Sequence, residues 1–143
     1  MNKQINNNIN LIPDTNGIIN IVEHQGSLRR TINKFSKSNL KIIVPKFVLQ
    51  ETKKIKGYSE LETIEKLQSC LSAKIRVVSV NHDVMEYAKE LEKKYPRLHF
   101  PDSILLAYGR ICAYTILSYD CGLLDSATKE GVSTYTPKKG DHL

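Results

Sequence analysis

The sequence contains no long hydrophobic segment. None of its apolar stretches approaches the roughly 18 residues that a membrane-spanning helix requires. The first ten residues, MNKQINNNIN, are polar and rich in asparagine, and they lack the apolar stretch of a secretory signal. We therefore expect no membrane association and a frayed tail that leads into the first strand.

Cysteine is also scarce. Cys70, Cys112 and Cys121 are an odd number without Cys-x-x-Cys spacing, and none of the four histidines has the spacing of zinc ligands. This argues against a disulfide framework and a cysteine zinc site, and it fits a reducing, cytoplasmic environment. We expect all three cysteines to be small core residues.

Two common nucleotide-binding motifs are absent as well. Neither Gly-x-Gly-x-x-Gly nor Gly-Lys-Ser/Thr occurs in the 143 residues, which argues against dinucleotide and P-loop enzymes. The composition, with 41% hydrophobic and 25% charged residues, fits one compact domain with a substantial core. We expect residues 1–143 to form a single domain with flexible tails at about 1–7 and 137–143.

Positive charge exceeds negative charge. The formal net charge is +6 and the isoelectric point is near 9.2, a balance that favours polyanionic partners such as nucleic acid. The net charge alone does not distinguish a nucleic-acid-binding protein from one with an ordinary solvated basic surface. The candidate substrate-binding cations within this surplus are Arg29, Arg30, Lys53 and Lys54.

Short apolar, β-branched runs alternate with helical patterns along the whole chain. The predicted strands cover residues 8–13, 41–44, 75–80, 114–118 and 132–135. Apolar periodicity, capping signals and glycine stops predict helices over residues 16–22, 27–35, 45–56, 59–71, 81–95, 102–111 and 123–130. This alternation predicts an α/β fold built on a mainly parallel sheet.

Aspartates follow two of the predicted strands. Asp14 comes after Leu11-Ile12-Pro13, and Asp120 comes soon after a run that ends at Ser118. Because parallel strands end at one edge of a sheet, both carboxylates are expected at that edge. Asp102 begins a helix one crossover earlier, and Glu51 lies about two turns into the helix after the second strand. Each acid alone also fits an ordinary turn, helix N-terminus or boundary position.

Convergence of these four acids would favour metal-ion chemistry. Clustered carboxylates repel one another unless a cation lies among them. An oxygen-only pocket suits hard divalent ions such as Mg²⁺ or Mn²⁺, which activate water near phosphodiesters. A basic protein with such a pocket fits a phosphate-polymer substrate.

Four motifs in sequence order carry a family resemblance from about residue 10 to residue 136. They are Asp14-Thr15-Asn16; Val44-Pro45 with Val48-Leu49-Gln50-Glu51; Asp102-Ser103-Ile104-Leu105-Leu106-Ala107; and Ser118-Tyr119-Asp120-Cys121-Gly122-Leu123-Leu124 with Gly131-Val132. Together they resemble the PIN-domain ribonucleases. The resemblance implies a three-layer sandwich, in which helices flank both sides of a central sheet of about four to five strands. It also implies a Mg²⁺- or Mn²⁺-dependent ribonuclease that leaves 5′-phosphate and 3′-hydroxyl ends.

The resemblance also implies roles for individual residues. The catalytic acids would be Asp14, Glu51, Asp102 and Asp120, of which Asp14, Asp102 and Asp120 would hold the metal. Thr15 or Asn16 would orient Asp14, and Ser118 would support the metal or its water. Tyr119 departs from the family pattern, which often has asparagine there.

Among PIN-domain proteins, a small single domain resembles the VapC-type toxins. That likeness implies RNA as substrate, a homodimer and a small antitoxin protein as partner. The alternatives are an rRNA-processing PIN endonuclease and a non-catalytic PIN-like module that binds RNA or protein. An aspartate-nucleophile phosphohydrolase would need a second aspartate two residues after Asp14, where this sequence has Asn16.

Overall fold

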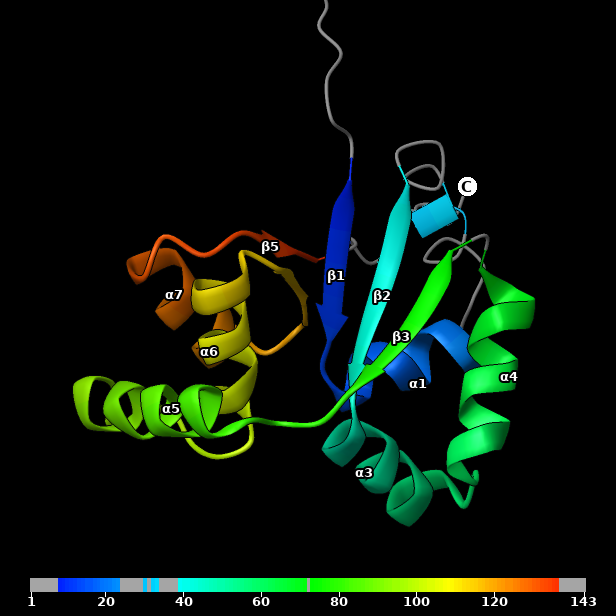
Figure 1. Cartoon of the computed structure of the whole chain (residues 1–143), viewed down its shortest axis with the longest axis horizontal. Helices are drawn as coiled ribbons and strands as arrows, with labels where there is room; N and C mark the ends of the chain where they lie inside the picture. Colours follow the sequence, from blue (N-terminus) through cyan, green and yellow to red (C-terminus); the bar gives the residue numbers. More distant parts are fainter. Residues whose placement is uncertain (1–7, 24–29, 31, 34–38, 72, 137–143) are drawn as a thin grey trace, which may run out of the picture.

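Five parallel strands form one sheet at the centre of the molecule (Figure 1). The computed structural model describes residues 8–23, 30, 32–33, 39–71 and 73–136. The order β3-β2-β1-β4-β5 is built from β1 (Ile9–Pro13), β2 (Leu40–Pro45), β3 (Lys74–Val78), β4 (Thr115–Leu117) and β5 (Thr134–Tyr135). The predicted α/β fold with a parallel sheet is therefore confirmed.

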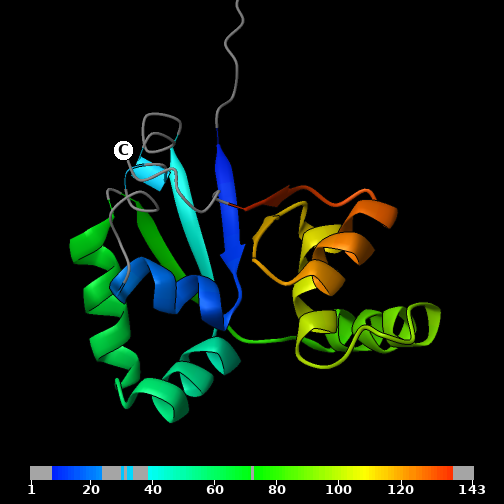
Figure 2. The same cartoon turned by 180° about the vertical axis from the view of Figure 1, so that it is seen from behind.

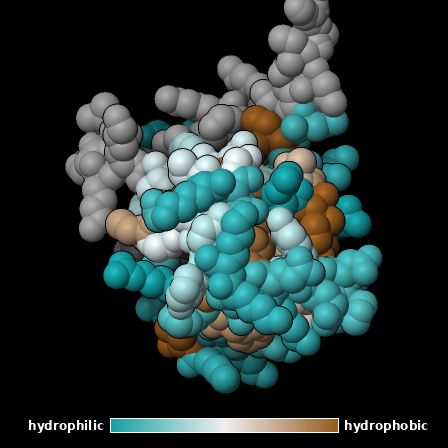
Figure 3. Space-filling view, turned by 90° about the vertical axis from the view of Figure 1, so that its left-hand side faces the viewer, coloured by the Kyte–Doolittle hydropathy of each residue, from teal (hydrophilic) through white to brown (hydrophobic). Residues whose placement is uncertain are grey.

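Helices cover both faces of this sheet, as Figures 1 and 2 show from opposite sides. The described residues contain α1 (Thr15–Glu23), α3 (Lys46–Lys56), α4 (Glu60–Cys70), α5 (His82–Lys94), α6 (Asp102–Cys112) and α7 (Cys121–Lys129). The first three pack on one face and the last three on the other. The outer side over the second group is mainly hydrophilic, with separate hydrophobic areas (Figure 3). The three-layer arrangement is confirmed.

Alternation along the strands supplies both cores. On β1, Leu11 packs among residues of α1, α3 and α4, whereas Ile12 packs among residues of α5, α6 and α7. Successive strand residues point to opposite faces, and a strand buried on both faces therefore reads as a continuous apolar run.

Local signals set several helix boundaries as predicted. The Ser59 side chain accepts a hydrogen bond from the Glu62 N–H at 3.0 Å, and the Glu62 side chain accepts one from the Ser59 N–H at 3.1 Å, which is the expected capping box. Gly57 ends α3 with φ of 78°, a conformation that glycine adopts without steric cost. Asn81 caps α5 through the Val84 N–H.

Several sequence predictions need correction or lie outside the described residues. The strands predicted over 75–80 and 132–135 are shorter, because Ser79 and Val80 already lead across to α5 and only two residues of β5 pair as a strand. Cys112 and Cys121 are exposed rather than in the core, because both lie on outward positions of helix ends. The predicted helix over 27–35 is described only at residues 30 and 32–33, and the predicted tails lie outside the described residues.

No helix among the described residues is long and apolar enough to cross a membrane.

The order of the strands determines where a binding site can form in this sheet. The chain first builds outward from β1 to β2 and β3, and then crosses to the other side of β1 to add β4 and β5. In open parallel sheets, ligands bind beyond the carboxyl ends of the strands where the winding direction reverses, which here is between β1 and β4.

Candidate active site

A cleft of about 230 Å³ lies at the carboxyl ends of β1 and β4. All four predicted acids line it. The complete lining is Asp14, Thr15, Asn16, Phe47, Val48, Glu51, Ile55, Pro101, Asp102, Leu105 and Asp120. These residues come from four separate segments, so the cleft exists only in the folded chain. No lysine or arginine occurs among the described lining residues.

Asp14 is the most deeply placed acid of the four. It follows β1 directly, and its side-chain Oδ1 accepts a hydrogen bond from the Gly17 N–H at 2.7 Å. Its Oδ2 accepts one from the Ser118 hydroxyl at 2.6 Å. Burial raises the pKa of Asp14 above its usual range, and the charges of Asp120 and Glu51 act in the same direction, whereas the two hydrogen bonds oppose the rise.

Ser118 joins the ends of two strands. Besides donating to Asp14, its fully buried hydroxyl accepts a hydrogen bond from the Asp120 N–H at 3.0 Å. The Asp120 side chain in turn accepts from the Leu123 N–H at 2.8 Å and so caps α7. Asp120 is exposed at the cleft, and the hydrogen bond from the first turn of α7 fixes the position of its carboxylate. The half-buried Tyr119 between them leaves both Ser118 contacts intact.

Thr15 positions Glu51 rather than Asp14. Its hydroxyl donates a hydrogen bond to Glu51 Oε1 on α3, which ties the start of α1 to the acid of the second motif. Asn16 is exposed, and its backbone carbonyl accepts a hydrogen bond from the Asn20 side chain. The expectation that Thr15 or Asn16 orients Asp14 is therefore corrected: Gly17 and Ser118 do so, because the tight turn after β1 aims the Gly17 N–H at the carboxylate.

Asp102 stands in the first turn of α6 and faces the other acids. Burial raises the pKa of Asp102 to about 6, and the charges of Asp120, Asp14 and Glu51 add to the rise, while His99 opposes it. The four carboxylates act on one another because all four line the same cleft. An acid with a pKa near neutrality in a cleft is also a feature of functional sites.

The donor chemistry of the cleft fits a hard divalent cation. Four carboxylates with hydroxyl support, and with no basic residue among the lining that the structure describes, form an oxygen-only set of the kind that Mg²⁺ and Mn²⁺ prefer. The described side chains do not, however, form a ready group of three or more His, Cys, Asp or Glu ligands. Asp14 and Glu51 instead use oxygens in hydrogen bonds to Ser118 and Thr15.

The predicted substrate-binding cations lie elsewhere. Lys53 and Lys54 are exposed on α3, and Arg30 is exposed on the short helical segment that precedes β2; none of the three lines the cleft. Arg29 lies outside the described residues. Their contact with a substrate remains a prediction.

The sequence analysis did not identify two groups of site residues. Gly17 was assigned no role from the sequence, although its position three residues after Asp14 was the available signal. The apolar walls, including Phe47 and Pro101, come from helix starts and carried no separate signal. Phe47 packs near the exposed ring of Phe100, with 6.3 Å between ring centroids.

Solved structures share this fold. A chain of the VapBC2 complex from Rickettsia felis, bound to a promoter DNA fragment, matches with a TM-score of 0.69 and 14% identity, over 91% of this chain and 100% of that chain. A chain of DNA-bound VapBC from Salmonella typhimurium gives 0.67 and 13% identity, over 91% and 99%. A chain of a toxin–antitoxin complex from Klebsiella pneumoniae gives 0.62 and 17% identity, over 90% and 98%.

These likenesses define the fold class. No protein-family model and no curated protein matches the sequence. The chain has a PIN-like α/β fold, and it shares that fold with chains of VapBC toxin–antitoxin complexes. The fold implied by the four motifs is confirmed.

Proposed function

We propose that this chain is a Mg²⁺- or Mn²⁺-dependent ribonuclease that hydrolyses phosphodiester bonds in RNA. The observation that carries the proposal is the convergence of Asp14, Glu51, Asp102 and Asp120 on one cleft at the reversal point of a parallel sheet. Four carboxylates without a basic neighbour in the described lining are costly unless a cation joins them. A pure binding module would gain nothing from keeping them together.

The four acids divide two tasks between them in this proposal. Asp14, Asp102 and Asp120 hold the ion, directly or through water, and Glu51 completes the pocket and orients the attacking water. When bound, the ion supplies positive charge that activates water and stabilises the attacking and leaving oxygens. Ser118 keeps Asp14 in place from β4, and Thr15 keeps Glu51 in place from the start of α1.

The charge distribution supports RNA as the substrate. The chain carries a net charge of +6, although its cleft is lined by four acids. A basic surface attracts a phosphate polymer over long range, and the acidic cleft accepts it only together with divalent cations. In this proposal the basic surface attracts the RNA, and the acidic cleft with its cations carries out the hydrolysis.

The shared fold with VapBC complexes supports a role as the toxin of a toxin–antitoxin pair. In that role the chain works in the cytoplasm as a homodimer and is inhibited by a small antitoxin encoded beside it. The test is co-expression with the neighbouring short reading frame. If the chain is a toxin, its expression stops growth, and co-expression of the antitoxin restores growth. An rRNA-processing endonuclease instead produces defined rRNA ends and has no dedicated inhibitor.

The activity itself is tested with purified protein and RNA. Cleavage is expected with Mg²⁺ or Mn²⁺, and it should disappear in EDTA and in Asp14→Asn. The folded state of Asp14→Asn is checked by its thermal unfolding transition. Cleavage that persists without metal, or full activity of Asp14→Asn, would refute the proposal, and binding of RNA without cleavage would favour the non-catalytic module.

A further inference from the structure

The sheet face that packs against α5 and α6 changes character halfway along its strands. Near the carboxyl ends, Ile12 and Ile43 are fully buried in the core. Two residues earlier on the same side of each strand stand Asn10 and Lys41, and Lys74 continues this row on β3 through the parallel register. The polar half of this face therefore follows from the sequence alternation and not from a local irregularity.

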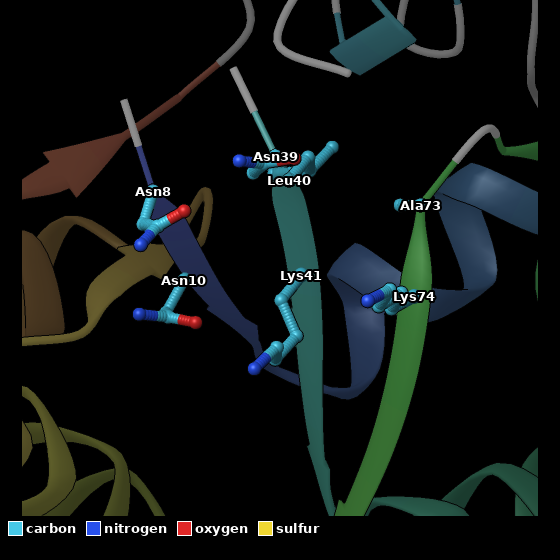
Figure 4. A pocket seen from close by; sticks show the side chains of 7 residues that line it. All are labelled: Asn8, Asn10, Asn39, Leu40, Lys41, Ala73 and Lys74. Carbon is cyan, nitrogen blue, oxygen red and sulfur yellow. The ribbon is translucent and has the colours of Figure 1, made fainter. Parts of the chain in front are cut away.

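A pocket of about 520 Å³ occupies this polar half (Figure 4). Its described lining is Asn8, Asn10, Asn39, Leu40, Lys41, Ala73 and Lys74. Figure 4 shows the two lysines on the adjacent strands β2 and β3, Asn10 on β1, and Asn8 and Asn39 just before β1 and β2. In Figure 1 no described helix lies in front of this part of the sheet. The described lining contains two cations, three amides and no acid.

A third cation and an aromatic residue extend the surface. Arg76 is exposed on β3, on the same side as Lys74 and in register with Ile43. The charge of its guanidinium opposes the rise that burial causes in the pKa of Tyr114. Tyr114 stacks on Tyr108, with 6.2 Å between ring centroids, and borders β4.

These cations have no acidic partner in the described part of the chain. The ion pairs found there involve Lys56, Lys89, Lys94 and Lys129, and not Lys41, Lys74 or Arg76. Grouped positive charges on neighbouring strands repel one another and create a positive potential that an anion relieves. The neighbouring asparagine amides add hydrogen-bond donors that suit phosphate oxygens.

We propose that this surface, the basic sheet face of Asn10, Lys41, Lys74 and Arg76, binds the phosphodiester backbone of RNA. The inference rests on the proposed function for the identity of the polyanion and assigns the substrate a second contact. Asn10 lies on β1 and Asp14 directly follows that strand, four residues later, or about 13 Å along an extended chain. The basic sheet face and the acidic cleft are therefore separate contacts at opposite ends of the strand.

The test separates binding from cleavage. A fluorescein-labelled single-stranded RNA of about 16 nucleotides is titrated in EDTA at several salt concentrations, with wild type, the double variant Lys41→Ala/Lys74→Ala, and the control Lys89→Ala/Lys93→Ala. The control removes the same charge from exposed positions of α5. Each single-strand phosphate contact contributes about 0.7 to the slope of log affinity against log salt. The double variant should lower the slope by about 1.4 and weaken binding roughly tenfold, and the control should change neither.

The single variant Lys74→Ala guards against misfolding, because Lys74 is exposed; its slope should fall by about 0.7. Equal slopes for the double variant and the control would overturn this inference and leave the ribonuclease proposal standing. If the double variant loses RNA binding and the wild type does not cleave RNA, the inference stands and the ribonuclease proposal is rejected. Absence of wild-type RNA binding would overturn the inference. Loss of self-association with unchanged RNA binding would assign the face to a second copy of the chain instead.

Discussion

The Ser118 hydroxyl lies 2.6 Å from Asp14 Oδ2, although the two residues are 104 positions apart in the chain. Asp14 follows β1 and Ser118 follows β4, the two strands between which the winding of the sheet reverses. The contact therefore joins the two halves of the fold at the point where the acids converge. It also makes the position of a proposed metal ligand depend on the packing of both halves.

Replacing Ser118 should affect stability and activity together. Ser118→Ala leaves one buried Asp14 oxygen and the Asp120 N–H without their partner, so we expect a loss of about 1–3 kcal/mol in the free energy of unfolding. Urea unfolding measures this loss, and initial cleavage rates should fall at least as strongly. Ser133→Ala, at an exposed position before β5, is the control; equal behaviour of the two variants would contradict the proposed importance of the contact.

The two glycines nearest the acids should respond differently to alanine. A Cβ on Gly17 would lie 3.2 Å from Asp14 Oδ1, from the Leu117 carbonyl oxygen and from Pro13 Cβ. The Leu117 carbonyl belongs to a central strand and cannot move easily, so Gly17→Ala should destabilise by about 1–3 kcal/mol despite better helix propensity.

Gly122→Ala is the matched control for that variant. Its Cβ would meet only Asp120 Oδ2, at 3.4 Å, and the position is exposed in α7. We expect Gly122→Ala to be neutral or stabilising by up to about 1 kcal/mol, because alanine favours helix. Thermal unfolding of both variants tests these two expectations. A Gly17→Ala variant that is more stable than wild type would contradict the predicted steric clash of its Cβ beside Asp14.

The Thr15 hydroxyl should matter for catalysis more than for folding. Thr15→Val keeps the side-chain shape but removes the hydrogen bond to Glu51, and Thr15→Ser keeps the hydroxyl. If Glu51 orients the attacking water, Thr15→Val should lower the cleavage rate about tenfold and Thr15→Ser should retain most activity. Equal rates for the two variants would remove Thr15 from the positioning of Glu51.

The ionised Asp102 carboxylate should lower the free energy of unfolding at neutral pH when no metal is present. Its pKa is about 6 in the folded protein and 3.8 in the unfolded chain, so the folded state binds more protons between these values. The free energy of unfolding therefore falls as pH rises through that window. After allowance for solvent screening, Asp102→Asn should be more stable than wild type at pH 7 by about 1–2 kcal/mol, and the two should converge below about pH 4.

Urea unfolding in EDTA at the two pH values measures this difference. The control is Asp125→Asn, because Asp125 is exposed and pairs only with Lys129 at 3.3 Å. It should change stability by less than about 1 kcal/mol. A less stable Asp102→Asn at pH 7 would contradict the repulsion among the acids.

The sequence predicted the four acids because each is attached to a readable local signal. Asp14 and Asp120 follow buried strands, Asp102 begins an apolar helix, and Glu51 interrupts an apolar helix face. Parallel pairing then brings strand ends together without knowledge of side-chain detail. The parallel α/β fold and most helix boundaries followed from the periodicity of the sequence, whereas the three-layer arrangement was implied by the resemblance to the PIN-domain ribonucleases.

Contacts between distant residues were not predictable in the same way. The partner of Thr15 depends on how α1 packs against α3, and the choice of Glu51 over Asp14 is fixed only by that packing. The row of Asn10, Lys41 and Lys74 depends on strand register, which spacing along the chain does not specify. The exposure of Cys112 and Cys121 likewise depends on which side of a helix end meets solvent.

The central claim is that the four acids promote hydrolysis by a metal-activated water, and the chemistry of the RNA ends tests it most directly. Purified protein is incubated with a labelled RNA and Mn²⁺, beside Asp14→Asn, and the ends of the products are determined. The account predicts 5′-phosphate and 3′-hydroxyl ends, formed by the wild type and absent with EDTA or Asp14→Asn. Products with 2′,3′-cyclic phosphate and 5′-hydroxyl ends, or equal cleavage by Asp14→Asn, would contradict it.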